Sequence, residues 1–204
     1  MVTGLVLAIC CIAADDQTKG VERRYEDGPV KAEYYRAAPP KSRRTLAQSF
    51  VGIRHKTAYY FDREGRSIIV RTSKMEVFAV FVPDRSWNVT PNDQRLIDHE
   101  QGHFDLMQIG ALQARIALKK ELSTLVGRGE SKQTAVKDLE RRTSEFLARF
   151  DVKALDENRI YDRDTRHGLR RSRQAEHRAE QKKRLAELTE KFKPKPKPAK
   201  KAGG

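Results

Sequence analysis

The sequence of 204 residues predicts an α+β fold, in which a small antiparallel or mixed sheet packs on a long helix and on a second, antiparallel helix. Three observations lead to this prediction. Residues 50–82 are rich in β-branched and aromatic side chains, which favour strands. Residues 90–125 place apolar side chains at helical spacing, and residues 131–150 do so again after a glycine-containing break. A highly charged third helix is expected over residues 172–192.

The predicted sheet contains three strands. They cover Phe50–Phe61, Ser67–Thr72 and Met75–Val82, and Asp62–Gly65 forms a turn between the first two. The third strand ends in an unbroken apolar run, so we expect it to lie inside the sheet or beneath a helix.

The first predicted helix has a clear start. Thr90 can act as its N-cap, and Pro91 suits its first position. Gly127-Arg128-Gly129 ends the apolar run, and the second helix follows over Ser131–Phe150. A turn at the glycines would make the two helices an antiparallel hairpin, which returns residues 158–168 to the beginning of the first helix.

The N-terminal segments differ from this core. Residues 1–14 form a short apolar run that ends in small residues, which is typical of a secretory signal peptide and predicts a secreted or periplasmic location. Both cysteines, Cys10 and Cys11, lie inside it, and lipid anchoring through either is disfavoured because Ile9 is a poor residue before such a site. Residues 15–47 are charged and poor in apolar groups, so we expect a linker or loosely packed arm.

Positive charge is concentrated at the C-terminal end. The formal net charge is +14, and residues 168–204 hold 13 Lys/Arg against 4 Glu, a net +9. The Lys/Pro tail, residues 193–204, cannot form a core and is expected to be disordered. Outside the cytoplasm this tail would contact anionic envelope polymers or lipid headgroups, or serve solubility alone. A nucleic-acid-binding protein is disfavoured, because acidic residues are mixed through residues 90–165.

Five consecutive residues of the long helix carry the chemistry: His99-Glu100-Gln101-Gly102-His103. Histidines four residues apart lie one turn apart on the same helix face, where both imidazoles can bind one Zn²⁺. Glu100 lies on the same turn and can reach a metal-bound water, as a hydrolytic general base must. The pair supplies only two ligands, whereas a catalytic zinc normally takes three from the protein.

The third ligand is expected from the segment that the hairpin returns to the motif. His167 is the natural choice there. Three carboxylates are the alternatives: Asp162, Asp164 and Asp105. Tyr161 is a candidate to donate a hydrogen bond to the oxyanion of a tetrahedral intermediate, and packing against the helix hairpin is its competing role. His55 and His177 have no partner at ligand spacing.

The helix motif, together with the downstream Tyr161-Asp162-Arg163-Asp164-Thr165-Arg166-His167-Gly168, resembles a bacterial family of predicted secreted zinc-dependent proteases catalogued as a domain of unknown function. The resemblance covers residues 48–180. It implies a zincin-like metallopeptidase domain over residues 48–192, with the two helix histidines as ligands and Glu100 as the base.

This chain departs from related patterns at two places. Gln174 stands where the family has a Gln, but His177 occupies the place of the family's Trp. The extended metzincin pattern is not met, because Leu106 and Ile109 occupy the places of its Gly and third His. We therefore do not expect a metzincin.

These motifs together predict a zinc-dependent metallopeptidase that acts on a peptide or protein substrate. Zinc held by His99, His103 and His167 would lower the pKa of its bound water to about 7. Glu100 would take that proton and pass it to the leaving amine. The alternative is a catalytically inactive zinc-binding or structural envelope protein of the same fold.

Overall fold

The structure, a computed structural model, describes residues 21–43 and 45–192. Its main sheet is built on a long antiparallel hairpin of β3 (Val51–Glu64) and β4 (Ser67–Phe81). The other edge of β4 pairs, also antiparallel, with two short strands: β1 (Arg23–Arg24) near its end and β6 (Val126–Gly129) near its start.

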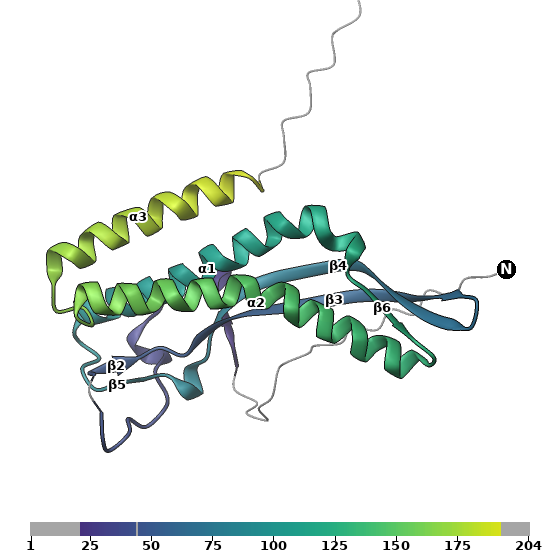
Figure 1. Cartoon of the computed structure of the whole chain (residues 1–204). Helices are drawn as coiled ribbons and strands as arrows, with labels where there is room; N and C mark the ends of the chain where they lie inside the picture. Colours follow the sequence, from purple (N-terminus) through teal and green to yellow (C-terminus); the bar gives the residue numbers. More distant parts are fainter. Residues whose placement is uncertain (1–20, 44, 193–204) are drawn as a thin grey trace, which may run out of the picture.

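Two long helices cover this sheet, and a third packs on them. They are α1 (Gln94–Glu121), α2 (Lys132–Thr165) and α3 (Arg171–Glu190). Helices α1 and α2 run side by side along the sheet, and α3 packs on α1 (Figure 1). A separate two-stranded sheet pairs β2 (Ala47–Gln48) with β5 (Trp87–Asn88), next to the beginning of α1.

Short 3₁₀ turns join several of these elements. They lie at Tyr25–Asp27, Ala32–Tyr34, Pro83–Arg85 and Leu122–Thr124. Over residues 21–43 and 45–192, none of the helices combines the length and the apolar character that crossing a bilayer requires.

The main core lies between the sheet and the two long helices. Val77 and Phe81 of β4 pack there against Phe104 and Met107 of α1 and against Phe146 of α2. Each such side chain removed from water contributes about 1.5–3 kcal/mol. The predicted α+β class is confirmed, together with the antiparallel sheet, the long helix that carries the motif and the antiparallel second helix.

The second and third predicted strands are one continuous strand. The break predicted at residues 73–74 is absent, because β4 runs through them as a bulge opposite β3. The register shifts between Ala58 and Tyr59, so Ser73 is the extra residue of a bulge, and its hydroxyl donates to the carbonyl of Ala58 at 3.0 Å. The hairpin turn is also tighter than predicted, since both strands continue to Glu64 and Ser67 around Gly65.

Helix α1 begins later than predicted. The N-cap is Asp93, not Thr90, because the Asp93 carboxylate accepts from the backbone N–H groups of Arg95 and Leu96. Pro91 therefore lies before the helix and not at its first position.

The glycine segment after α1 is a strand and not the predicted turn. Residues 126–129 form β6, which pairs with residues 68–71 of β4. A Cβ on Gly127 would overlap the carbonyl oxygen of Ala135, and one on Gly129 would overlap Thr134. These glycines therefore allow α2 to lie directly on the strand.

Helix α2 extends fifteen residues beyond the predicted end at Phe150. Its inward-facing stripe continues at spacings of four, three and four through Ala154, Asn158, Tyr161 and Thr165, of which Asn158 is partly exposed. Only one of these side chains is large and apolar in body, so the periodicity was too weak to reveal the extension. The antiparallel arrangement does return this part of the chain to His99, as expected.

The expected linker or loosely packed arm over residues 15–47 does not describe its visible part. Tyr25 packs edge-on against Phe104, with ring centroids 5.0 Å apart, and the N–H of buried Val30 donates to Gln101 of the motif at 2.7 Å. Tyrosines supply apolar area where aliphatic residues are scarce. The predicted signal peptide, residues 1–14, and the Lys/Pro tail, residues 193–204, lie outside the described residues.

Candidate metal centre

The two histidines of the motif meet on one face of α1. The Nε2 atoms of His99 and His103 are 3.2 Å apart, and their rings are nearly perpendicular. His99 is almost fully buried, whereas His103 reaches the wall of a pocket. This is the juxtaposition that the four-residue spacing predicts.

Asn158 of α2 sets the orientation of His103. The His103 Nδ1–H donates to the Asn158 side-chain oxygen at 2.5 Å, and the Asn158 amide in turn donates to the carbonyl of Ala154 at 2.7 Å. With Nδ1 protonated, the Nε2 atom carries the lone pair. An outer hydrogen bond of this kind is what orients a metal-binding histidine.

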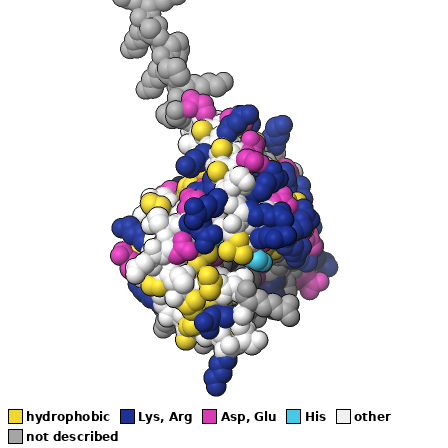
Figure 2. Space-filling model, turned by 90° about the vertical axis from the view of Figure 1, so that its left-hand side faces the viewer, with side chains coloured by type: hydrophobic (Ala, Val, Ile, Leu, Met, Phe, Trp, Pro, Cys, Tyr) yellow, Lys and Arg dark blue, Asp and Glu magenta, His cyan; other side chains and the backbone are white. Residues whose placement is uncertain are grey.

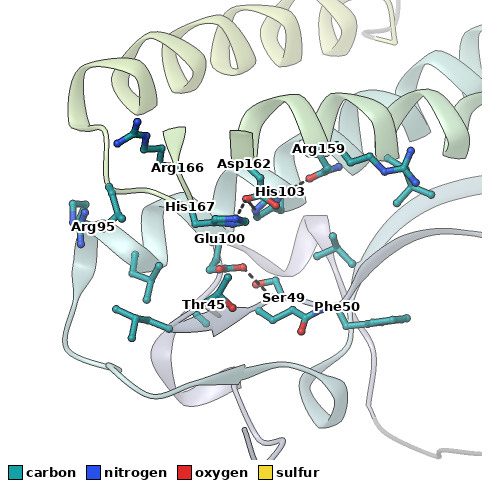
Figure 3. A pocket seen from close by; sticks show the side chains of 18 residues that line it. Thr45, Ser49, Phe50, Arg95, Glu100, His103, Arg159, Asp162, Arg166 and His167 are labelled. Carbon is teal, nitrogen blue, oxygen red and sulfur yellow. Dashed lines mark hydrogen bonds and ion pairs between the residues drawn. The ribbon is translucent and has the colours of Figure 1, made fainter. Parts of the chain in front are cut away.

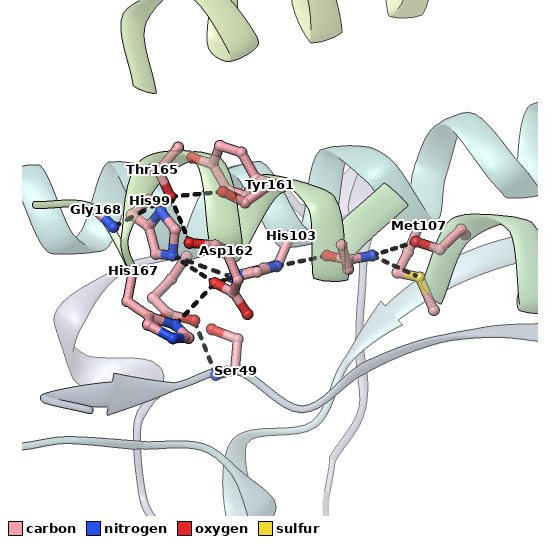
Figure 4. Close-up of polar contacts among 12 residues, drawn as sticks. Ser49, His99, His103, Met107, Tyr161, Asp162, Thr165, His167 and Gly168 are labelled. Atoms are coloured by element: carbon pink, nitrogen blue, oxygen red, sulfur yellow. Dashed lines mark hydrogen bonds and ion pairs between the residues drawn. The ribbon is translucent and has the colours of Figure 1, made fainter. Parts of the chain in front are cut away.

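Asp162 and His167 approach the same point from the end of α2. The Asp162 Oδ1 atom lies 3.1 Å from Nε2 of His99, 3.1 Å from Nε2 of His103 and 3.1 Å from Nδ1 of His167 (Figure 4). Asp162 is partly buried, and the His167 side chain is 55% exposed. One carboxylate oxygen therefore contacts three imidazoles.

The turn that presents His167 has an unusual backbone. Arg166 and His167 have positive φ angles of 48° and 52°, and Gly168 follows at 81°. Two successive non-glycine residues in this region are uncommon and carry strain. The Thr165 hydroxyl supports the turn, because it donates to the Tyr161 carbonyl at 2.7 Å and accepts from the Gly168 N–H at 3.3 Å.

Tyr161 lies behind the two histidines and not in the pocket. Its ring stacks on His99, with centroids 4.7 Å apart at 19°, and it is fully buried. Its hydroxyl lies against Gly102, where an added Cβ would come within 2.5 Å of the Tyr161 oxygen. This position away from the pocket favours the packing role of Tyr161 over the predicted hydrogen bond to an oxyanion.

The Glu100 carboxylate lies beside the histidines and faces the pocket. Its oxygen and the ring nitrogens of His99 and His103 are all within 4.8 Å of one another. The backbone N–H of Ser49 donates to Glu100 at 2.9 Å, and the Ser49 hydroxyl contacts that of Tyr35 at 3.1 Å. The segment before β3 therefore holds Glu100 in place.

Burial and the neighbouring carboxylates shift the pKa values of the two histidines in opposite directions. Burial lowers the pKa of His99. Burial also opposes the charging of His103, but its contact with Asp162 and the nearby Glu100 charge raise the pKa of His103 to about 8. Burial disfavours the Asp162 carboxylate, yet the two histidines outweigh it and hold the pKa of Asp162 well below its usual range. The same carboxylates would stabilise a metal cation.

The cluster forms the inner wall of an open pocket of about 560 Å³. Glu100, His103, Asp162 and His167 line it on one side (Figure 3). The segment that includes β2 and the start of β3 lines it on the other side, from Thr45 to Val51. A ligand in this pocket would touch the carboxylate and the imidazoles together.

Two of the three alternative carboxylates lie away from the histidine pair. Asp105 accepts hydrogen bonds from Tyr25 and Gln101 and pairs with buried Arg178 on the side facing α3. Asp164 pairs with His177 at 3.3 Å. Among these alternatives, only Asp162 contacts the two histidines of the motif.

A zinc ion suits the donor atoms of this cluster. Ligand atoms at tetrahedral positions around zinc, with bonds of about 2.0–2.1 Å, are separated by about 3.3 Å. The nitrogens of His99 and His103 and the oxygen of Asp162 are 3.1–3.2 Å from one another, close to that separation. The outer shell is incomplete at His99, whose buried Nδ1 has no hydrogen-bond partner within the described residues.

Sequence reasoning missed the residues that position the site. Asn158 lies on the part of α2 beyond its predicted end. If the helix is extended in the sequence, Asn158 lies one turn before Asp162 on the same face, and this spacing is the signal that could have identified it. Ser49 acts through its backbone N–H, which any residue except proline supplies, so the sequence carries no signal for it.

Comparison with protein-family models, with curated proteins and with solved structures finds no match for this chain. The resemblance to the secreted zinc-dependent protease family therefore stays a prediction.

Proposed function

We propose that this protein is a zinc-dependent metallopeptidase with a zincin-like fold. One observation carries the proposal: the Glu100 carboxylate and the His103 imidazole line an open pocket within 4.8 Å of each other. A base that faces a pocket beside metal ligands is the arrangement required for hydrolysis by an activated water. A purely structural zinc site does not require a carboxylate that faces an open pocket.

In this proposal His99, His103 and Asp162 hold the zinc. Zinc at such a site lowers the pKa of a coordinated water to about 7 and polarises a carbonyl oxygen. Asp162 replaces His167 as the third ligand, because its oxygen lies 3.1 Å from both motif nitrogens. His167 contacts that same oxygen from the exposed side of the pocket.

Glu100 and His167 would have separate roles in the reaction. Glu100, fixed by the Ser49 N–H, accepts a proton from water in the pocket and returns it to the amine that leaves. His167 is an exposed imidazole at the pocket wall, and its ring can donate a hydrogen bond to the oxyanion that forms on the carbonyl. This is the role that the sequence suggested for Tyr161.

A non-catalytic zinc protein is the second candidate, and a specific observation favours it. Four protein donors lie together here: the oxygen of Asp162 and one ring nitrogen each of His99, His103 and His167, all three at 3.1 Å from that oxygen. Four protein ligands close a tetrahedral site and are typical of structural zinc. The number of ligands therefore separates the two candidates.

Zinc content and peptide hydrolysis test the proposal together. We expect one zinc per wild-type chain after dialysis, none in His99→Ala, and one in Glu100→Gln without hydrolysis of a quenched fluorescent peptide library. His55→Ala is the matched control, because the His55 ring hydrogen-bonds to Thr57 on β3 and His55 does not line the pocket, so the change should leave both properties unchanged. An active Glu100→Gln protein would refute the mechanism.

The two ligand sets predict different results for the third and fourth donors. In the catalytic arrangement, Asp162→Asn loses zinc while His167→Ala retains it. In the structural arrangement, both variants weaken zinc binding and the wild-type protein hydrolyses nothing.

A further inference from the structure

The pocket beside the metal centre has an apolar rim. Among the described residues, seven large hydrophobic side chains are exposed, and three of them line this pocket: Leu46 at 45%, Leu155 at 41% and Leu169 at 64%. They come from three separate parts of the chain, before β3, on α2 and after α2. Exposed apolar groups that converge on one pocket mark a binding site.

The same face of the molecule presents this mixture of side chains. Figure 2 shows hydrophobic side chains next to a histidine, with Lys and Arg side chains gathered beside them. This view faces the end of the molecule where β2, β5 and the C-terminal end of α2 lie in Figure 1.

Three arginines complete the wall of the pocket. In Figure 3, Arg95 and Arg166 lie on one side of the cluster of His103, Asp162 and His167, and the side chain of Arg159 extends on the other side. Among the described residues, the acidic side chains in the wall are Glu100 and Asp162, which belong to the metal centre. Outside that centre, the charged side chains of the pocket are therefore all positive.

These arginines differ in the ion pairs and hydrogen bonds that their side chains already make. Arg95 is held by the carboxylate of Asp93 at 3.1 Å and the carbonyl of Gly168 at 2.6 Å. Arg159 pairs only with Asp156, and both side chains are more than half exposed, so this pair contributes little. The Arg166 side chain makes no ion pair or hydrogen bond within the described residues. Arg166 and Arg159 are thus available to a ligand.

We infer that this pocket binds a peptide segment that combines a large apolar side chain with a carboxylate next to it. The leucines of the rim would cover the apolar side chain, and Arg166 would bind the carboxylate, for which a guanidinium group is suited. The inference rests on the proposed function, because it names the substrate class of that site. The carboxylate is either an acidic side chain or a peptide C-terminus.

A peptide fits these observations better than a lipid surface. The basic and apolar groups lie inside a concave pocket whose inner wall is the metal centre, whereas a membrane would need them on a convex or flat face. Binding to anionic vesicles is kept below as an outcome that contradicts the inference.

The test measures binding and not hydrolysis. Fluorescence polarisation measures the binding of labelled peptides to the zinc-loaded Glu100→Gln protein. Three C-terminally amidated peptides consist of Ala and Gly residues around a central Leu-Glu, Leu-Gln or Ala-Glu pair. A fourth peptide carries Leu-Gln with a free C-terminus, so that the two sources of the carboxylate are separated. We expect the preferred carboxylate peptide to bind about tenfold more tightly than its uncharged or Ala counterpart, as one charge-assisted hydrogen bond implies.

Two variants and one control assign this selectivity to the pocket. Arg166→Ala should remove the carboxylate preference, and Leu169→Ser should remove the preference for Leu over Ala. Arg66→Ala, an exposed arginine at the tip of the β3–β4 hairpin, should change neither. Circular dichroism confirms that each variant is folded.

Three results would overturn the inference: binding of both carboxylate peptides, Leu-Glu and Leu-Gln with a free C-terminus, no tighter than that of amidated Leu-Gln; an equal loss in Arg66→Ala; or tighter binding to phosphatidylglycerol vesicles that Arg166→Ala abolishes. Selective binding without any hydrolysis by the wild-type protein would instead contradict the proposed function and leave the pocket assignment standing.

Discussion

Substitution of Gly102 should destabilise the protein, because the absence of a side chain at this position makes room for Tyr161. An added Cβ would lie 2.5 Å from the Tyr161 hydroxyl oxygen and 2.7 Å from two ring carbons. Tyr161 is fully buried and stacked on His99, so it has no free space to move into. Gly102→Ala therefore forces a shift in the packed layer between α1 and α2.

The expected magnitude is the difference between two opposing effects. Replacing glycine by alanine inside a helix stabilises it by about 1 kcal/mol. Overpacking a filled core costs about 1–3 kcal/mol, and three contacts below 3 Å place this site at the upper end. We expect Gly102→Ala to lower the free energy of unfolding by about 2 kcal/mol. The displaced ring would also push His99 away from His103 and weaken zinc binding.

Urea denaturation followed by circular dichroism measures this effect. Tyr161→Leu removes the atoms that the new methyl group meets, so adding Gly102→Ala in that background should be neutral or stabilising by up to about 1 kcal/mol. The double-mutant cycle then gives a coupling of about 2–3 kcal/mol. A Gly102→Ala protein as stable as the wild type would show that Tyr161 does not pack against the motif.

Other predictions concern the outer contacts of the site. Asn158→Ala should weaken zinc binding about 10–100-fold by freeing His103, while Asn158→Asp, which keeps an acceptor, should retain it; competition with a chelating dye measures both. Arg178→Met should lower the free energy of unfolding by about 3–5 kcal/mol, because it leaves Asp105 buried without its cation. Arg184→Met removes the more exposed ion pair with Glu157 and should lower it by less than about 1 kcal/mol. Equal losses in the two variants would contradict the importance of the buried pair. Zinc at 100 times its dissociation constant should stabilise the wild type by about 2.7 kcal/mol against thermal unfolding, and a chelator should reverse this.

Local sequence was enough for features that depend on neighbours along the chain. The face shared by His99 and His103 follows from helical periodicity, and the strand character of residues 51–81 follows from their β-branched and aromatic content. The return of residues 158–168 to the motif followed from two helices with a short connection.

Contacts between distant segments could not be read in this way. Whether Asp162, Asp164 or Asp105 faces the histidines depends on the rotation of α2 about its axis, and the packing of Tyr161 against Gly102 sets that rotation. The buried part of residues 21–43 depended on partners in α1, because isolated tyrosines show no periodic pattern.

The sequence by itself determined the α+β class, the histidine pair and the glutamate between them, since each depends on residues within a few turns of one another. Only the tertiary structure decided that Asp162 stands at the centre of the cluster, that Tyr161 is packing, and that arginines and exposed leucines share one pocket. These features join segments more than fifty residues apart, and their positions depend on how the helices and the sheet pack together.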